Sequence, residues 1–112
     1  MVQTISSQML KGILQGIMLM ILDKGPEYGY GLSKKMNHYG LENVPKGTIY
    51  PLLTTIEKRG LLVSKIKKSD EGPDRKYYFI TAEGQIAKKE FINEWGQLQT
   101  TVLKLIEEES QI

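Results

Sequence analysis

Lysine and hydroxyl side chains gather in one short stretch of the chain, residues 46–58. No acidic residue interrupts the stretch before Glu57, and its candidate contact residues are Lys46, Thr48, Tyr50 and Thr54. Cations and hydroxyls near the start of a helix are the groups that meet the phosphates and base edges of DNA. The same pattern also fits an ordinary solvent-exposed helix face, so this stretch by itself leaves both interpretations open.

The residue patterns that catalysis usually requires do not occur in this sequence. It has no cysteine, and its one histidine, His38, lies beside Asn37 near an expected helix end, where solvent exposure is more common than catalysis. We find no nucleophile elbow and no histidine or acid cluster with metal-ligand spacing. Gly29-Tyr30-Gly31 does not follow a strand, so it does not match a dinucleotide-binding loop. We therefore expect no enzyme, no metal site and no cofactor.

Hydrophobic periodicity predicts that the lysine and hydroxyl stretch belongs to the third of three helices. The expected helices are Gln8–Leu22, Tyr28–Tyr39 and Gly47–Arg59, each followed closely by a glycine. The third helix has one apolar face, made by Ile49, Leu52, Leu53 and Ile56. Its lysines and hydroxyls therefore lie on the side that faces away from the core.

Two strand-like runs follow the third helix. Leu61–Lys68 alternates in polarity and Arg75–Thr81 is rich in tyrosine and other strand formers, while the segment between them is dense in turn residues. This pattern predicts a hairpin with a long polar tip. Its basic residues are Lys65, Lys67, Lys68, Arg75 and Lys76. They could hold a DNA backbone, but lysines on edge strands also serve to prevent edge-to-edge pairing.

A long final helix is expected from a cap at Thr81 to about Glu109. Its apolar residues are spaced four and three apart, as in a coiled-coil seam: Phe91, Trp95, Leu98, Val102 and Leu105. Nothing obvious in the same chain covers this seam. We therefore expect it to form the interface of a homodimer.

Length and charge fit a small one-domain protein that meets a polyanion. The chain has 112 residues and a net charge of +2. Residues 1–80 carry a surplus of five positive charges, and residues 81–112 carry a surplus of three negative charges. The longest apolar run, residues 17–22, is far shorter than the roughly 20 residues of a membrane span. We see no signal peptide, and we expect a cytoplasmic protein without a membrane partner.

Several short motifs, in this order and spacing, resemble the PadR family of transcriptional regulators. They are Met9-Leu10-Lys11-Gly12, Gly25-Pro26-Glu27-Tyr28-Gly29-Tyr30, Gly47-Thr48-Ile49-Tyr50-Pro51-Leu52-Leu53, Glu57-Lys58-Arg59-Gly60-Leu61-Leu62, Gly72-Pro73-Asp74-Arg75-Lys76-Tyr77-Tyr78 and Ile80-Thr81-Ala82-Glu83-Gly84. The resemblance covers about residues 9–95. The single C-terminal helix is similar to the compact branch of that family.

The resemblance implies a fold, a dimer and a set of DNA contacts. It implies that Lys46, Thr48 and Tyr50 meet DNA from the recognition helix and that Tyr28 touches a phosphate. Arg75 and Lys76 would act from the wing, the hairpin beside that helix. Strand alternation directs at least one of Tyr77 and Tyr78 into the core, so neither is taken as a contact. The acidic wing tip argues against insertion into the minor groove.

Trp95 is the only tryptophan of the chain. Some compact members of the family place a tryptophan here at the dimer centre, where a pair can bind flat aromatic compounds. Met18, Met20 and Phe91 would then be candidates to line the pocket. The alternative is that Trp95 only anchors the interface, since its position in the seam already accounts for it.

The sequence thus predicts a mostly α-helical α+β protein with a small β-hairpin. Residues 1–81 would form a winged helix-turn-helix DNA-binding domain and residues 82–112 a C-terminal dimerisation helix. The expected function is sequence-specific regulation of transcription, as a repressor that binds double-stranded DNA at an inverted repeat as a homodimer. A small aromatic or cationic effector would release it. The alternative that remains open is a winged-helix adaptor that binds proteins and not DNA.

Overall fold

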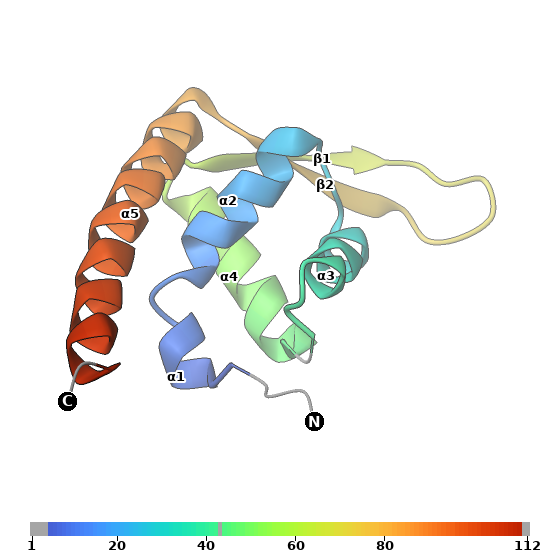
Figure 1. The fold of residues 1–112 in the computed structure, drawn as a ribbon. Helices are drawn as coiled ribbons and strands as arrows, with labels where there is room; N and C mark the ends of the chain where they lie inside the picture. Colours follow the sequence, from blue (N-terminus) through green and yellow to red (C-terminus); the bar gives the residue numbers. More distant parts are fainter. Residues whose placement is uncertain (1–4, 43, 111–112) are drawn as a thin grey trace.

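Four helices and a two-stranded hairpin pack around a common apolar core, and a long helix runs along one side (Figure 1). The structure is a computed structural model that describes residues 5–42 and 44–110. Its elements are α1 Ser7–Leu10, α2 Leu14–Lys24, α3 Gly29–His38, α4 Lys46–Lys58, β1 Leu62–Lys67, β2 Arg75–Ile80 and α5 Ala82–Ser110. This order confirms the predicted fold class, a winged helix-turn-helix with a long C-terminal helix.

The first predicted helix, Gln8–Leu22, is wrong as a single element. The chain turns between α1 and α2, and the Ile13 amide donates a hydrogen bond to the Leu10 carbonyl at 2.9 Å. Gly12 lies within this turn, and glycine disfavours a continuous helix because of its backbone entropy. The bend allows Leu10 and Leu14, on either side of it, both to reach the core.

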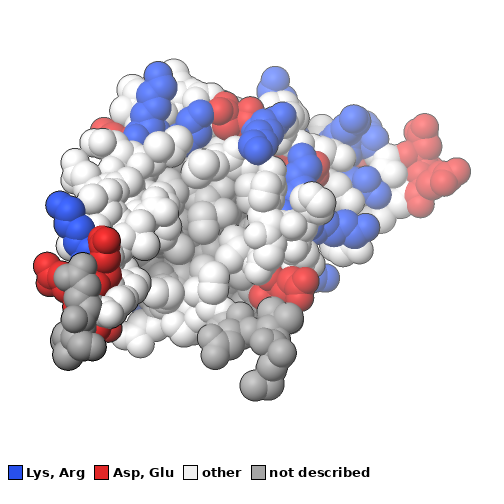
Figure 2. Space-filling view, in the orientation of Figure 1, with Lys and Arg blue, Asp and Glu red and all other residues white. Residues whose placement is uncertain are grey.

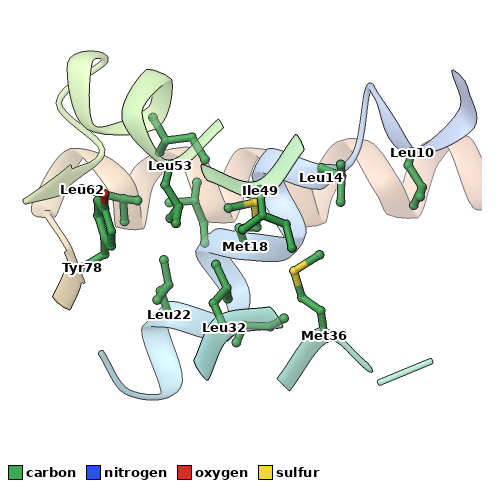
Figure 3. Packing of buried hydrophobic residues seen from close by; sticks show 13 residues of the cluster. Leu10, Leu14, Met18, Leu22, Leu32, Met36, Ile49, Leu53, Leu62 and Tyr78 are labelled. Carbon is green, nitrogen blue, oxygen red and sulfur yellow. The ribbon is translucent and has the colours of Figure 1, made fainter. Parts of the chain in front are cut away.

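The core combines side chains from every element except α5 (Figure 3). Its members are Leu10, Leu14, Met18, Leu19, Ile21, Leu22, Leu32, Met36, Ile49, Leu53, Ile56, Leu62 and Tyr78. The apolar face predicted for the third helix is confirmed, since Ile49, Leu53 and Ile56 are buried and Leu52 is partly buried. This packing fixes which side of α4 faces solvent.

The hairpin is antiparallel, with Leu62 opposite Ile80 and Lys67 opposite Arg75. A short extended segment before α3 pairs with the free edge of β2. There the Tyr78 amide donates a hydrogen bond to the Glu27 carbonyl at 2.9 Å. Tyr78 is buried, as strand alternation required for one of the two tyrosines. The pairing places the residues just before α3 directly beside β2.

The start of α5 is fixed to the end of α4 through Thr81. Its hydroxyl donates to the Gly60 carbonyl at 2.7 Å and accepts from the Gly84 amide at 3.0 Å, which confirms the predicted helix cap. Gly84 is buried against the Leu61 carbonyl, so that a side chain here would collide with backbone. From this attachment α5 extends over 29 residues, a length of roughly 44 Å.

The expectation that nothing in the same chain covers the α5 seam is wrong for Phe91. Its ring packs against Gly16 of α2, where an added Cβ would overlap it. The other seam residues, Trp95, Leu98, Val102 and Leu105, are 43–58% exposed. Only the first third of α5 is therefore held by its own chain.

No helix within residues 5–42 and 44–110 is both long and apolar enough to cross a membrane.

Candidate nucleic-acid interface

The outer side of α4 presents the hydroxyl and lysine side chains that the sequence indicated. Lys46, Thr48, Tyr50 and Thr54 are all exposed, opposite the buried Ile49–Ile56 face. The first turn of α4 contains no acidic residue, so the positive end of the helix dipole is uncompensated there. The Thr54 hydroxyl donates to the Tyr50 carbonyl at 3.3 Å, which leaves its oxygen free to accept a bond.

Tyr50 is held in place by the first residue of α3. Its ring lies directly on Gly29, where a Cβ would overlap the ring. The side chain remains 44% exposed, so one part of it is fixed by packing and another part faces solvent. A glycine at the start of α3 thereby sets the direction in which α4 presents this tyrosine.

Tyr28 joins the start of α3 to the outer face of the wing. Its ring centre lies 5.4 Å from that of Tyr77, and the Arg75 guanidinium lies 4.6 Å from the Tyr28 ring centre. The Lys67 ammonium is 5.5 Å from the Tyr77 ring centre. Stacking on an aromatic face orients a cation and leaves its N–H groups able to donate. The structure thus brings the predicted residues Tyr28 and Arg75 into direct contact.

Tyr30 extends this arrangement from the wing to α4. Its ring centre lies 6.2 Å from that of Tyr28, and the ammonium groups of Lys34 and Lys46 lie 4.9 and 5.6 Å from it. Tyr30 and Lys34 were missed as site residues in the sequence, whereas Lys67 was among the basic residues noted on the hairpin. The signal was available for Tyr30, since it follows Tyr28 by two residues, but Lys46 comes from another helix, α4.

We call this set the tyrosine–cation cluster. It contains Tyr28, Tyr30, Tyr77, Lys34, Lys46, Lys67 and Arg75. The cluster joins the N-terminal end of α4 to the loop end of the two wing strands by way of α3. Because its cations come from two helices and two strands, they can contact phosphates on both sides of a groove into which α4 fits.

Lys76 lies on the opposite face of the hairpin from Arg75. Its ammonium forms an ion pair with Glu57 of α4 at 3.4 Å, and the Ser64 hydroxyl donates a hydrogen bond to the same carboxylate. The Ser64 hydrogen bond and the Lys76 charge hold the pKa of the Glu57 carboxyl below its usual range. The nearby Tyr78 phenol and Glu57 raise the pKa of Lys76. One carboxylate therefore offsets the charge of Lys76.

The wing tip is acidic and exposed, as the sequence indicated. Asp70, Glu71 and Asp74 all lie at the solvent surface of the turn between β1 and β2. Figure 2 shows them as a red group beyond the blue side chains of the hairpin. The cations of the wing strands therefore lie just before this acidic tip, in the half of the hairpin nearer the loop.

The structure separates the residues suggested around Trp95. Met18 is fully buried in the core and is not available to a ligand, whereas Met20 is 38% and Trp95 43% exposed. Phe91 packs against Gly16. Of the four side chains, Met20 and Trp95 are therefore the exposed ones.

Comparison with known proteins agrees with this geometry. Residues 18–90 match the model of the transcriptional regulator PadR-like family. A PadR-like transcriptional regulator from Bacillus cereus is 46% identical, with 89% of this chain and 97% of that chain covered and a TM-score of 0.80. A Streptococcus transcriptional regulator is 34% identical, with 89% and 98% covered and a TM-score of 0.79. A PadR family regulator from Eggerthella lenta is 34% identical, with 89% and 87% covered and a TM-score of 0.80.

Proposed function

Because the chain belongs to the PadR-like family of transcriptional regulators, we propose that it binds a specific DNA sequence as a homodimer. Residues 1–81 carry the DNA-binding surface and residues 82–112 join the two subunits. The proposed DNA contacts are Tyr28, Lys46, Thr48, Tyr50, Thr54, Arg75 and Lys76. Because such a regulator works where the chromosome lies, we propose that it acts in the cytoplasm.

The observation that carries this proposal is the position of the tyrosine–cation cluster beside the exposed side of α4. The side chains of Thr48, Tyr50 and Thr54 are exposed and can meet base edges in the major groove, while the surrounding cations meet the backbone. A protein-binding adaptor would not need this concentration of positive charge next to the same helix.

The exposed part of the α5 seam supports the homodimer. Trp95, Leu98, Val102 and Leu105 form an apolar stripe that a single chain leaves in water. Two chains related by a two-fold axis would present two copies of α4. We therefore propose an inverted repeat as the operator, with half-sites roughly 10 bp apart from centre to centre.

We further propose that the protein represses transcription and that a small aromatic or cationic compound releases it. A dimer of this size covers a promoter by steric blocking and offers little surface for recruiting a polymerase. Trp95 supports the effector part of the proposal, because it is an exposed aromatic residue at the start of this stripe, where a pair of indole rings could meet across the axis.

Selection of bound DNA from a random pool, followed by footprinting, tests the proposed function. The expected result is a two-fold symmetric site whose affinity falls steeply with salt, because each neutralised phosphate releases counterions. A Lys46→Ala, Arg75→Ala double variant serves as the matched control and should enrich no site. Failure to enrich any sequence at low salt would favour the adaptor alternative instead.

A further inference from the structure

Glu57 lies near the C-terminal end of α4, at the opposite end of this helix from Lys46 and Thr48. A carboxylate is unfavourable there, because the negative end of the helix dipole repels it. The Glu57 side chain is only 28% exposed. It accepts a hydrogen bond from the Ser64 hydroxyl and forms the ion pair with the Lys76 ammonium at 3.4 Å. Its partners therefore belong to the hairpin and not to its own helix.

This carboxylate is the polar link between α4 and the two strands of the wing. Within residues 5–42 and 44–110, the hydrogen bonds and ion pairs that join α4 to β1 or β2 all end on Glu57. Its Oε2 atom accepts from Ser64 of β1, and its Oε1 atom pairs with Lys76 of β2. A single side chain of the recognition helix thus holds both strands.

Of the two contacts, the hydrogen bond from Ser64 is the firmer one. The Lys76 side chain is 47% exposed, so water screens its charge and the ion pair contributes little. Ser64 is half-buried, and a hydrogen bond to an ionised acceptor is stronger than one between neutral groups. The attachment of the wing to α4 therefore depends mainly on an oxygen of residue 57 that can accept from Ser64.

The Ser64 contact lies where the hairpin leaves the core. Ser64 is opposite Tyr78, which is the last buried residue of β2 in the direction of the loop. Beyond this point the hairpin projects past the other elements and carries Lys67 and Arg75 (Figure 1). The Thr81 contact at the base of the hairpin does not reach this projecting part. Glu57 therefore restrains the tilt of the wing toward α4.

We propose that Glu57 is a positioning residue for DNA recognition. It fixes the wing relative to α4, so that Arg75 meets a phosphate while α4 lies in register in the major groove. Phosphate contacts hold a protein in register on the duplex, and base contacts then specify the sequence. Loosening the wing should therefore weaken operator binding more than binding to unrelated DNA. The inference rests on the proposed DNA binding and adds a residue that itself touches no DNA.

Two substitutions of Glu57 separate its hydrogen bond from its charge. Glu57→Gln and Glu57→Ala both remove the ion pair and raise the net charge equally, but only glutamine keeps an oxygen that can accept from Ser64. For Glu57→Ala, the ratio of the Kd for unrelated DNA to the Kd for the operator should fall about fivefold or more, like the loss of a base contact. Glu57→Gln should keep the parent ratio. Equal ratios in the two variants, whether high or low, would overturn the inference.

A distance measurement reports the position of the wing without DNA. Because the chain has no native cysteine, the exposed residues Lys58 and Asp70 can be changed to cysteine and spin-labelled, one at the end of α4 and one at the wing tip. Labelled subunits are mixed with an excess of unlabelled ones, so that only distances within a subunit are measured. Electron–electron double resonance should give equally narrow distance distributions for the parent and Glu57→Gln, and a broader one for Glu57→Ala. Equal widths in all three would overturn the inference.

Ser64→Ala provides an independent check, because it removes the same hydrogen bond and leaves the charges of Glu57 and Lys76 unchanged. It should broaden the distance distribution and lower the Kd ratio as Glu57→Ala does, and circular dichroism checks that each variant is folded. A parent that binds an operator, with Kd ratios unchanged in both alanine variants, contradicts the role of Glu57 but not the proposed function. A parent that enriches no DNA site contradicts the proposed function itself, whatever the distance distributions show.

Discussion

At the residue scale, the alternation of side chains along β2 gives two neighbouring cations different environments. Arg75 stacks on Tyr28 at the outer face of the wing, and Lys76 is paired with Glu57 on the inner face. Both match the same family motif, and the sequence predicted the same role for both. Because a carboxylate already offsets Lys76, we expect Arg75 to contribute more to the attraction of a phosphate backbone.

A comparison of variants in which glutamine replaces the charged side chains tests this difference. Arg75→Gln should weaken binding to all DNA sequences and make the salt dependence shallower by about one counterion, because one phosphate contact is lost. The matched control replaces both members of the ion pair, Glu57→Gln with Lys76→Gln, and leaves the net charge unchanged. It should bind close to the parent level in a salt titration by fluorescence anisotropy. If the paired variant loses as much as Arg75→Gln, Lys76 contributes as much as Arg75 in spite of its ion pair with Glu57.

Lys46 and Tyr50 should contribute to sequence recognition. Lys46→Ala and Tyr50→Ala are each expected to weaken operator binding by on the order of 1–3 kcal/mol, with a smaller loss on unrelated DNA. Tyr50→Phe is the matched control, since it retains the packing on Gly29 and removes only the hydroxyl. Operator and random DNA are compared by titration at one fixed salt concentration. Equal losses on both DNAs would mean that these residues touch only the backbone.

At the scale of elements, α5 is attached to the DNA-binding part by a small number of contacts near its start. Phe91 packs on Gly16, and Asp23 at the end of α2 accepts hydrogen bonds from Gln85 and Lys88. The rest of α5 projects beyond its own chain. These side chains link α5 to α2, and Thr81 links its start to the end of α4.

The Asp23 contact predicts a pH dependence of stability. The hydrogen bond from Lys88, followed by that from Gln85, holds the pKa of Asp23 below its usual range. A lowered folded-state pKa means that the contribution to stability is full above about pH 4, the ordinary aspartate value, and is lost as pH falls through the folded pKa. Asp23→Asn should therefore destabilise the protein at pH 6, and this effect should shrink as the pH falls below about 4.

Urea unfolding at several pH values measures this effect. The matched control is Asp70→Asn at the exposed wing tip, where the change should have little effect at any pH. The expected size for Asp23 is small, because the pair is partly exposed and water screens it. A stability difference between parent and Asp23→Asn that stays constant from pH 6 downwards would show that the ion pair is not its source.

At the scale of the whole molecule, a substitution in the exposed α5 seam should affect dimer formation without affecting the folding of the single chain. Leu98 is 54% exposed in the single chain, so Leu98→Asp should not disturb the core. In a dimer it would bury an unpaired charge, and we expect the variant to dissociate while keeping its helix content. Light scattering and circular dichroism measure the two properties. Ile66→Asp, which changes an exposed wing residue, should remain dimeric, and a dimeric Leu98→Asp variant would exclude this seam as the interface.

Trp95 offers a direct test of effector binding, because it is the only tryptophan. A planar aromatic cation that stacks between two Trp95 rings should quench their fluorescence at micromolar concentration. The Leu98→Asp variant is the control and should show no comparable quenching, since its rings no longer meet. Release from DNA further requires that the ligand bind the free dimer better than the DNA-bound one. Absence of quenching in the dimer would leave Trp95 as an interface anchor only.

Local patterns in the sequence determined the order and type of the elements and the solvent-facing side of α4. Periodic apolar residues, the Thr81 cap and the glycines after α3 and α4 act over a few residues, so they can be interpreted without the fold. Gly40 and Gly60 indeed have positive φ angles at these helix ends. The exception is the break after α1, where the apolar spacing of Leu10 and Leu14 fits both a continuous helix and a bend.

Only the tertiary structure decided which side chains meet. The stacking of Arg75 on Tyr28, the pairing of Lys76 with Glu57 and the contact of Phe91 with Gly16 each join residues far apart in the chain. These contacts depend on how the elements pack, and local spacing carries no information on the distance between elements. The sequence therefore identified which residue types could contact DNA, and the packing of α3 and α4 against the hairpin determined which of them share a surface.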